Sequence, residues 1–299
     1  MPGTALRELT AHKGDLIMQR LFLLLSVSAL LLLSACQHEG PTVTQSVVVQ
    51  SVAGIPEDPM DPRWQDVPEY RARLILQDLV EPRLLDPSTQ ELRVRGMVDA
   101  KALVLRLSWD DPDRDDLPKP DGFFDACAVQ IPVAGDVSLP APQMGEPGRP
   151  VSITYWNASW QAAADGREDS ITAIYPNARI DHYPFQAHSL PESARPEVEK
   201  RYSPARAAQN PVSGPHKTAV QDMLAEGPGT ISAAARQSSS GRGVRSGEAW
   251  VVVLRRELPA ELQQGAPGTQ IAFAVWQGAN DEVGARKMRT GWVPINRGK

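Results

Sequence analysis

Cysteine is nearly absent from this chain of 299 residues, which contains only Cys36 and Cys127. Without a Cys-x-x-Cys pair, the chain cannot form cysteine-type zinc sites, cysteine-ligated iron–sulfur clusters or the covalent attachment of a c-type haem. Cys127 lies in an alternating, strand-like run, DACAVQIPV, where a thiol usually packs as a small buried hydrophobe. The scarcity of cysteine therefore excludes a whole group of metal and redox sites.

A surplus of basic residues is also missing. The 31 Lys and Arg residues are outnumbered by 36 Asp and Glu residues, and the formal net charge is -5. No basic face or basic tail appears, which argues against nucleic acid as a partner. Aromatic residues make up only 6% of the chain, whereas it has 27 prolines and 22 glycines. Frequent proline and glycine favour many short strands and long loops over a helical bundle.

Several signatures of enzymes and metal sites are absent as well. The chain has no nucleophile elbow, no Walker loop and no paired-histidine metal motif. The glycine-rich segment 241–247 precedes a strand pattern and so lacks the helix N-terminus of a phosphate site. The acidic segment 110–122 lacks the glycine and terminal glutamate of an EF-hand loop, so a solvated loop is favoured over calcium binding. His182 and His188 lie in a proline-rich segment, where polar surface is favoured over a metal role.

The N-terminal region carries the most specific local signal. A short positive region follows Met18, an apolar core comes next, and Leu-Ser-Ala-Cys ends at Cys36, which is typical of a bacterial lipoprotein signal peptide. A transmembrane anchor is the alternative, but the apolar run is too short to span a bilayer comfortably. We therefore expect a mis-annotated upstream start over 1–17, a signal peptide over 18–35 and acylation of Cys36.

Lipidation of Cys36 has two consequences. Cys127 then has no partner within the chain, so no intrachain disulfide is expected even in an oxidising compartment. The mature protein is expected to be periplasmic and anchored to a membrane by its lipid. Gln37, in place of an aspartate after the lipidated cysteine, favours sorting to the outer membrane over the inner membrane.

The rest of the chain predicts an all-β protein. Residues 36–55 are expected to be a tether that leads into a first strand, and 56–299 one domain. Alternating apolar residues and hairpin signals predict a two-sheet antiparallel sandwich with long loop insertions and a few short helices. Within it, 217–227 favours a short helix ended by Gly227, and 236–247 a long hairpin loop.

Two residues stand out as candidate ligands, although local pattern does not decide their roles. Met144 lies in a proline- and glycine-rich loop, PAPQMGEPGRPV, between two expected strands. Lys287 lies in a turn between two tryptophans, WQGANDEVGARKMRTGW, near the end of the sequence. Taken alone, a methionine usually fills a core and a turn lysine is usually solvated.

A family resemblance favours a ligand role for both residues. The chain from about Pro56 to Ile295 resembles the haem b-binding γ subunit of ethylbenzene dehydrogenase and its relatives in dimethyl sulfide dehydrogenase, selenate reductase and chlorate reductase. The segments that carry the resemblance, in family order, are DPRWQDVP, LSWDDP, FFDACAVQIP, PQMGEPGRPVSITYWNASW, YSPARAAQNPVS, AVQDMLAEGPGTIS, AWVVVLRREL and FAVWQGANDEVGARKMRTGW.

The resemblance implies a specific cofactor and partners. In that family a methionine and a lysine hold the haem iron axially, and they fall on Met144 and Lys287. It further implies non-covalent haem b, no catalysis at the haem, and electron transfer with a molybdenum enzyme that has catalytic and iron–sulfur subunits, or with a periplasmic cytochrome. Lysine binds iron only as the free amine, whereas free lysine has a pKa near 10.4. A thioether favours ferrous iron.

The chain also departs from the family pattern. Gln277 stands where the family commonly has aspartate, and Met288, Arg289 and Thr290 stand where serines tend to follow the lysine. Met288 is therefore a rival ligand, unless a strand there turns its side chain away from Lys287. The alternative function is a family 9-like carbohydrate-binding module without haem, which the sandwich and the segment PMDPRWQDVP also resemble. A visible spectrum would distinguish a haem protein from such a module.

Overall fold

The computed structural model describes residues 43–120, 122–133, 138–179, 191–214 and 216–298. The signal peptide, Cys36, His182 and His188 lie outside these ranges, so their predicted roles remain predictions. Within the described residues, no helix is both long enough and apolar enough to cross a membrane.

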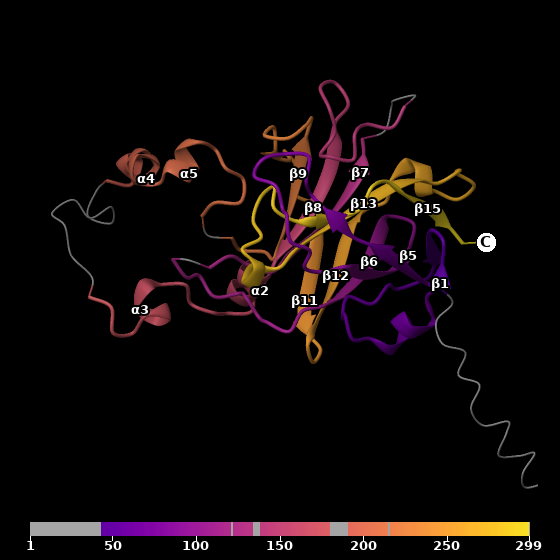
Figure 1. Cartoon of the computed structure of the whole chain (residues 1–299), viewed down its shortest axis with the longest axis horizontal. Coiled ribbons are helices and arrows are strands. Elements are labelled where there is room, and N and C mark those ends of the chain that lie inside the picture. The colour runs from indigo at the N-terminus through magenta and orange to yellow at the C-terminus, as the bar shows by residue number, and fades with distance from the viewer. Residues whose placement is uncertain (1–42, 121, 134–137, 180–190, 215, 299) are drawn as a thin grey trace, which may run out of the picture. The chain divides into compact units, whose positions relative to one another are not determined.

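The described chain is mostly β-structure, as the sequence predicts. Its strands hydrogen-bond in the order β10-β9-β8-β7-β13-β15-β2-β5-β6-β12-β11 (Figure 1). In chain order they are β1 (Val43–Thr44), β2 (Val47–Ser51), β3 (Glu69–Arg73), β4 (Ile75–Leu76), β5 (Glu91–Val98), β6 (Ala102–Asp110), β7 (Ala126–Pro132), β8 (Val151–Asn157), β9 (Val220–Ala225), β10 (Ser232–Ala233), β11 (Ser240–Arg245), β12 (Ala249–Glu257), β13 (Thr269–Trp276), β14 (Met288–Arg289) and β15 (Val293–Arg297).

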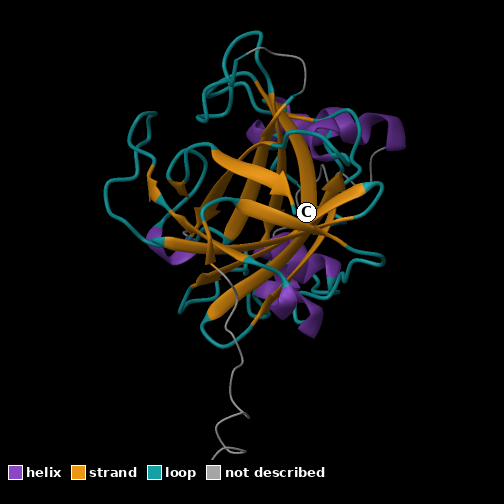
Figure 2. Ribbon diagram, turned by 90° about the vertical axis from the view of Figure 1, so that its right-hand side faces the viewer, coloured by secondary structure: helices purple, strands orange, loops and turns teal. Residues whose placement is uncertain are grey.

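The order of strands folds back on itself to make two layers (Figure 2). Strand β13 joins them, since it pairs with β7 at one part of its length and with β15 at another. At the far ends, β11 meets the other layer: a Cβ on Gly243 would lie 2.2 Å from the ring of Trp156, and one on Gly241 would lie 2.6 Å from Val220. These close approaches explain why β11 carries glycines.

Most strand pairs are antiparallel, as expected, but the N-terminal strands are not. β2 lies parallel to both β15 and β5, and β1 lies parallel to β3. Since parallel neighbours need long crossover connections, this part of the sheet is assembled from segments distant in sequence. The sheet is therefore mixed.

The core between the layers follows from alternation along each strand. On β7, β8 and β13, every second residue points inward, and the inner side chains include Val129, Trp156 and Phe273. Trp156 is fully buried and meets Trp109 and Trp250 edge to face, with ring centres 6.3 and 5.1 Å apart. Aromatic packing of this kind fills the interior densely.

Three local expectations are wrong. Residues 43–51, predicted as tether, form β1 and β2, because Val47 and Val49 are buried in the core. The helix predicted within 217–227 is strand β9, and the loop predicted over 236–247 contains β11. The helices are short, as expected: η1 (Pro62–Asp66), α2 (Ala158–Ala164), α3 (Ile171–Ile174), η3 (Glu192–Ala194), α4 (Arg195–Tyr202), α5 (Pro204–Ala207), η4 (Ala260–Leu262) and η5 (Gly278–Asn280).

Candidate functional site

A cavity of about 550 Å³ lies on the outer face of β7, β8, β9 and β13. Its floor is apolar and is made partly of small residues, Ala128, Ala272 and Ala274. These alternate with inward-facing core residues on the same strands, so one strand serves the core on one side and the cavity on the other. The volume is in the range of about 300–1,000 Å³ that is usual for small-molecule and cofactor sites.

Met144 lies at the cavity, in the loop between β7 and β8. Its backbone is left-handed, with a φ of 70°, which is strained for a residue with a side chain and is tolerated mainly at functional sites. The N–H of Gly227 donates to the Met144 carbonyl at 2.8 Å. The side-chain amide of Gln130 donates to the Pro142 carbonyl at 3.1 Å. The strained loop is thus held from two strands.

Lys287 ends the loop that joins β13 to β14. The backbone N–H of Gln77 donates to the Lys287 carbonyl, and the Gln77 side-chain amide donates to the Ala285 carbonyl, both at 3.1 Å. The Lys287 Nζ lies 3.9 Å from the Met144 Sδ and 5.1 Å from the centre of the Trp276 ring. The fold therefore brings the two candidate ligands together, although their role as iron ligands stays a prediction.

The electrostatics of the cavity act on the Lys287 amine. Burial among apolar groups lowers the pKa of Lys287 to about 8, and the nearby charge of Arg289 lowers it as well. Both effects favour the free amine, because burial removes the hydration of the ammonium form and Arg289 repels its positive charge. The site supplies what a lysine ligand requires, an amine that gives up its proton readily.

The two tryptophans around Lys287 have distinct contacts. Trp276 lines the cavity, and its Nε1 donates to the Gly284 carbonyl at 3.1 Å, which fixes the loop. Trp292 donates from Nε1 to the Pro140 carbonyl at 2.7 Å and so attaches the loop of Met144 to the chain after β14. The aromatic frame therefore positions both candidate ligands.

The rival ligand Met288 points away from the cavity. It is almost fully buried in the core between the layers, because β14 places it on the face opposite to Lys287. Arg289 is on the same face as Lys287 and lines the cavity. The strand geometry thus removes Met288 as an iron ligand at this cavity.

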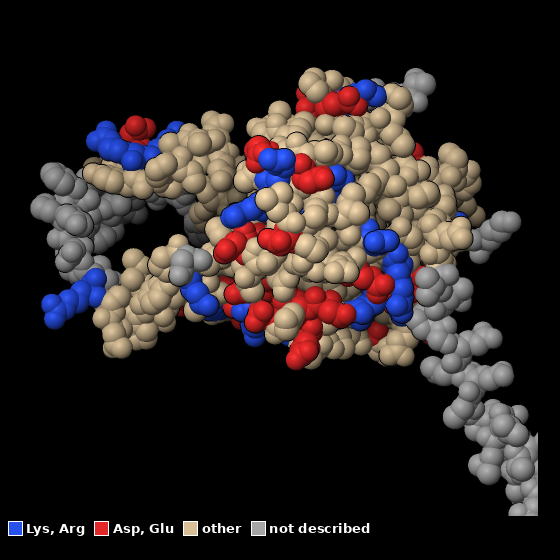
Figure 3. Space-filling view, in the orientation of Figure 1, with Lys and Arg blue, Asp and Glu red and all other residues tan. Residues whose placement is uncertain are grey.

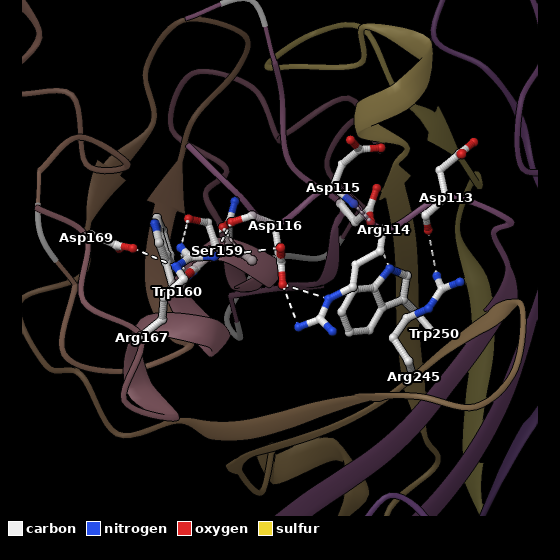
Figure 4. Close-up of polar contacts among 12 residues, drawn as sticks. Asp113, Arg114, Asp115, Asp116, Ser159, Trp160, Arg167, Asp169, Arg245 and Trp250 are labelled. Atoms are coloured by element: carbon white, nitrogen blue, oxygen red, sulfur yellow. Dashed lines mark hydrogen bonds and ion pairs between the residues drawn. The ribbon is translucent and has the colours of Figure 1, made fainter. Parts of the chain in front are cut away.

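The acidic segment forms ion pairs within the chain (Figure 4). Asp116 accepts from Arg114 at 2.7 Å and lies 3.7 Å from Arg167. Arg245 donates to the carbonyls of Asp111 and Asp113 at 2.7 and 2.8 Å. No group of three or more His, Cys, Asp or Glu that could hold a metal occurs among the described residues.

Figure 3 shows acidic side chains gathered along one edge of this face, with Lys and Arg dispersed among them. Asp110, the last residue of β6, exposes 79% of its side chain. The cavity lining differs from this edge, because it includes two cationic residues, Lys287 and Arg289, and one acidic residue, Glu81.

Sequence reasoning missed most of the cavity wall. The alanines of β7 and β13 attracted no attention, although the pattern of a small residue at every second position was visible in ACAVQI and IAFAVW. On a strand, such a pattern means that one face is packed with large side chains and the other has room above it. Arg289 was noted as a departure from a family pattern and as a positive charge near Lys287, but not as part of a cavity wall.

Known proteins are similar to this chain over most of its length. A family model described as "Ethylbenzene dehydrogenase" matches residues 61–288, a range that includes Met144 and Lys287. One similar curated protein is a heme subunit assigned to the respiratory nitrate reductase of Haloferax mediterranei. It is 24% identical over 243 residues, which are 79% of this chain and 67% of that protein.

Two further relatives are named as gamma subunits. The chlorate reductase subunit gamma of Ideonella dechloratans is 25% identical over 83% of this chain and 83% of its own length. The dimethylsulfide dehydrogenase subunit gamma of Rhodovulum sulfidophilum is 25% identical over 80% of this chain and 74% of its own length. All three relatives are thus similar over most of both chains.

A solved structure was also aligned, that of a carbohydrate binding module of family 9 from Caldicellulosiruptor kristjanssonii in complex with glucose. The alignment covers 86% of this chain and 96% of that chain, at 9% identity and a TM-score of 0.33. A likeness this weak carries no argument about ligand or function.

Proposed function

Because the chain belongs to the ethylbenzene dehydrogenase family, we propose that it is a non-catalytic electron-transfer subunit that binds one haem b non-covalently in the cavity. The observation that carries the proposal is the pairing of Met144 and Lys287, whose donor atoms face each other 3.9 Å apart at an apolar cavity. The names of the relatives, which include a heme subunit and two gamma subunits, support it.

The residues present fit an axially held haem. Metal bonds of about 2.0 Å to nitrogen and about 2.3 Å to sulfur, the values for zinc, give the scale, so a metal between the two donors needs a separation of about 4.3 Å. The observed 3.9 Å is within a small side-chain adjustment of that value. The floor of small and apolar residues suits a flat, largely apolar macrocycle.

Each ligand residue has a separate task. Lys287 offers an amine whose pKa is lowered to about 8 by burial and by Arg289, so little free energy is needed to remove its proton. Met144 offers a soft thioether, which favours the ferrous state and raises the reduction potential. The haem, when bound, takes up and releases one electron. With Met144 and Lys287 both bound to the iron, substrate would have no open coordination position there.

The partners are proposed from the same family membership. The electron is exchanged with a molybdenum enzyme that has catalytic and iron–sulfur subunits, and with a periplasmic cytochrome or the redox pool of the membrane. The protein is held in the periplasm by a lipid on Cys36, on the outer membrane. Cys36→Ser is expected to abolish incorporation of labelled fatty acid, and labelling that persists in this variant would contradict the anchor.

The test of haem ligation is optical. Purified protein supplied with haem b is expected to give a six-coordinate spectrum, and acid–acetone is expected to strip the pigment. Met144→Ala should open one axial position to carbon monoxide and lower the potential, because a ligand that favours Fe(II) is lost. Lys287→Ala should open the opposite position.

Met288→Ala is the matched control, since Met288 adjoins Lys287 in sequence but faces the core. It should leave the spectrum unchanged. A protein that stays colourless with haem supplied, as the carbohydrate-binding alternative predicts, would refute the proposal. A wild-type spectrum retained in Lys287→Ala would show that the axial ligand is a different residue.

A further inference from the structure

Arg289 is a buried cation in the wall of the cavity. Only 7% of its surface is exposed, and β14 places it on the same face as Lys287. Its one hydrogen bond within the described chain is long, from Nη1 to the carbonyl of Thr290 at 3.4 Å, and its Nε has no partner there. A guanidinium has five N–H donors, so most of its capacity is unused.

A buried charge is expensive unless it is paired. No carboxylate within the described ranges lies within 4.0 Å of the Arg289 guanidinium. Asp78 is close enough to favour the charged form of Arg289, but it is exposed and forms no ion pair with it. Lys287, the nearest cation, adds repulsion rather than compensation. Within the described residues the Arg289 guanidinium thus forms no ion pair, and its free donors at the cavity are complementary to an anionic ligand.

The chemistry of a guanidinium narrows the choice of anion. Its planar donors match a carboxylate or phosphate in a bidentate arrangement. Haem b is an apolar macrocycle with two propionate carboxylates, so one end of the molecule needs polar partners. Among the described residues that line the cavity, Arg289 and Lys287 are the cations. The other polar side chains are neutral amides, Tyr155, Thr290 and the carboxylate Glu81, none of which offers a carboxylate a charged donor.

We infer that Arg289 binds a haem propionate and fixes the rotation of the macrocycle about the axis between Met144 and Lys287. The inference rests on the proposed haem binding and adds a residue to it. An axial pair holds the iron but leaves that rotation free, whereas a charge-assisted hydrogen bond at the rim sets one orientation. Arg289 is in this sense a positioning residue, which acts on the cofactor without contacting the iron.

The experiment is a thermodynamic cycle on the whole mature protein. Haem b and haem b dimethyl ester, in which both propionates are neutral, are titrated into apoprotein, and the dissociation constant is measured by absorbance. Wild type should bind the ester roughly tenfold or more weakly than haem b, the value of one charge-assisted hydrogen bond. Arg289→Met should bind haem b as weakly as wild type binds the ester, with little further loss on esterification.

Matched variants show whether the change in haem affinity comes from the charge of Arg289, from its bidentate geometry or from misfolding. Arg286→Met removes the same charge three residues away, at a side chain that packs over the Phe123 ring and not on the cavity, and should not change the ratio of affinities. Arg289→Lys keeps the charge but loses the bidentate geometry, so its ratio should be intermediate. Circular dichroism of each apoprotein verifies folding.

The outcomes distinguish the proposal of haem binding from the proposed role of Arg289. If wild type takes up neither haem, the proposed function fails. If wild type binds haem b with a six-coordinate spectrum, but Arg289→Met discriminates haem from its ester as strongly as wild type does, the haem proposal stands and the role of Arg289 is refuted. Equal affinity of wild type for haem and ester refutes that role without any mutation.

Discussion

The two faces of the layer formed by β7, β8, β9 and β13 are both apolar, yet they are built differently. The inner face carries Trp156 and Phe273, which are fully buried against the opposite layer. The outer face carries alanines at Ala128 and Ala274, above which a cavity of about 550 Å³ is formed. Residue size therefore separates the structural face from the binding face where hydrophobicity does not.

This difference has an energetic meaning. On the inner face every side chain has neighbours on all sides, so removal of atoms leaves a void that the structure cannot close. On the outer face the room is already present in the protein, and the fold tolerates it because the surrounding loops of Met144 and Lys287 are held by hydrogen bonds. A ligand that occupies the space would supply the contacts that the alanines do not.

The largest effect is expected on the inner face. Trp156→Ala deletes a ring that contacts Trp109 and Trp250 and leaves Gly243 without its neighbour. The free energy of unfolding of the apoprotein should fall by about 3–5 kcal/mol. Urea unfolding followed by fluorescence measures it. A loss below about 1 kcal/mol would show that the two layers are not packed against each other here.

An intermediate effect is expected when the cavity is filled. Ala274→Leu adds three carbons to the floor where the macrocycle is proposed to lie. Haem affinity should fall by roughly tenfold or more, the effect of about 1.4 kcal/mol or more of steric conflict. The unfolding free energy of the apoprotein should change by less than about 1 kcal/mol, because the cavity has room for the side chain.

The same substitution also checks the comparison between faces. Val275→Leu, on the adjacent position that faces the core, provides the control. It should lower stability through overpacking and leave haem affinity unchanged. The reverse pattern, with Ala274→Leu harming only stability, would mean that the ligand lies elsewhere.

The smallest effect concerns pH and the polar end of β7. Asp125 is fully buried and accepts from Trp250 Nε1 at 2.9 Å and from the N–H of Gly278 at 3.0 Å. Burial, together with the charge of Asp111, raises the pKa of Asp125 to about 7. A raised carboxyl pKa means that the folded state holds its proton more tightly than the unfolded state.

The stabilising contribution of this proton is therefore complete below about pH 4 and is lost as pH rises through about 7. Between these values the unfolding free energy of the apoprotein should fall as pH rises, because the unfolded state releases this proton at a lower pH than the folded state does. Asp125→Asn should flatten the profile, although its stability is lower at acid pH. Parallel profiles for the two proteins, measured by urea unfolding from pH 4 to pH 8, would contradict the assignment.

Much of the fold could be predicted, and the failures have physical causes. β12 and β13 are apolar runs, and their own residues are enough to predict strands. β9 was mistaken for a helix because Asp222 interrupts its alternation. The buried carboxylate of Asp222 accepts from Thr154 of β8 at 3.0 Å and from the N–H groups of Ser238 and Ser239 at 2.9 Å. β11 resembles a loop because its glycines make room for Trp156. The residues that explain both errors, Thr154 and Trp156, lie on β8, so the sequences of β9 and β11 alone do not reveal them.

The candidate site, like the fold, could be predicted from the sequence only in part. Met144 and Lys287 were found by resemblance, and no local property of either residue could select it. The left-handed backbone of Met144 and the apolar surroundings of Lys287 exist only in the folded protein. Met288 was named as a rival ligand unless a strand turned its side chain away from Lys287. The structure has that strand, β14, and buries Met288 in the core.

The spacing of the two donor residues also constrains how the protein matures. Met144 and Lys287 are separated by 143 positions, and the strand pairs β7–β13 and β13–β14 must form before their side chains meet. Long-range pairing of this kind is slow, because the closure of a long loop precedes the contacts that stabilise it. If haem binds as proposed, a chain that has emerged only as far as Met144 would offer one of the two proposed ligands. Haem would then be inserted late in biogenesis, after the polypeptide has emerged past Lys287.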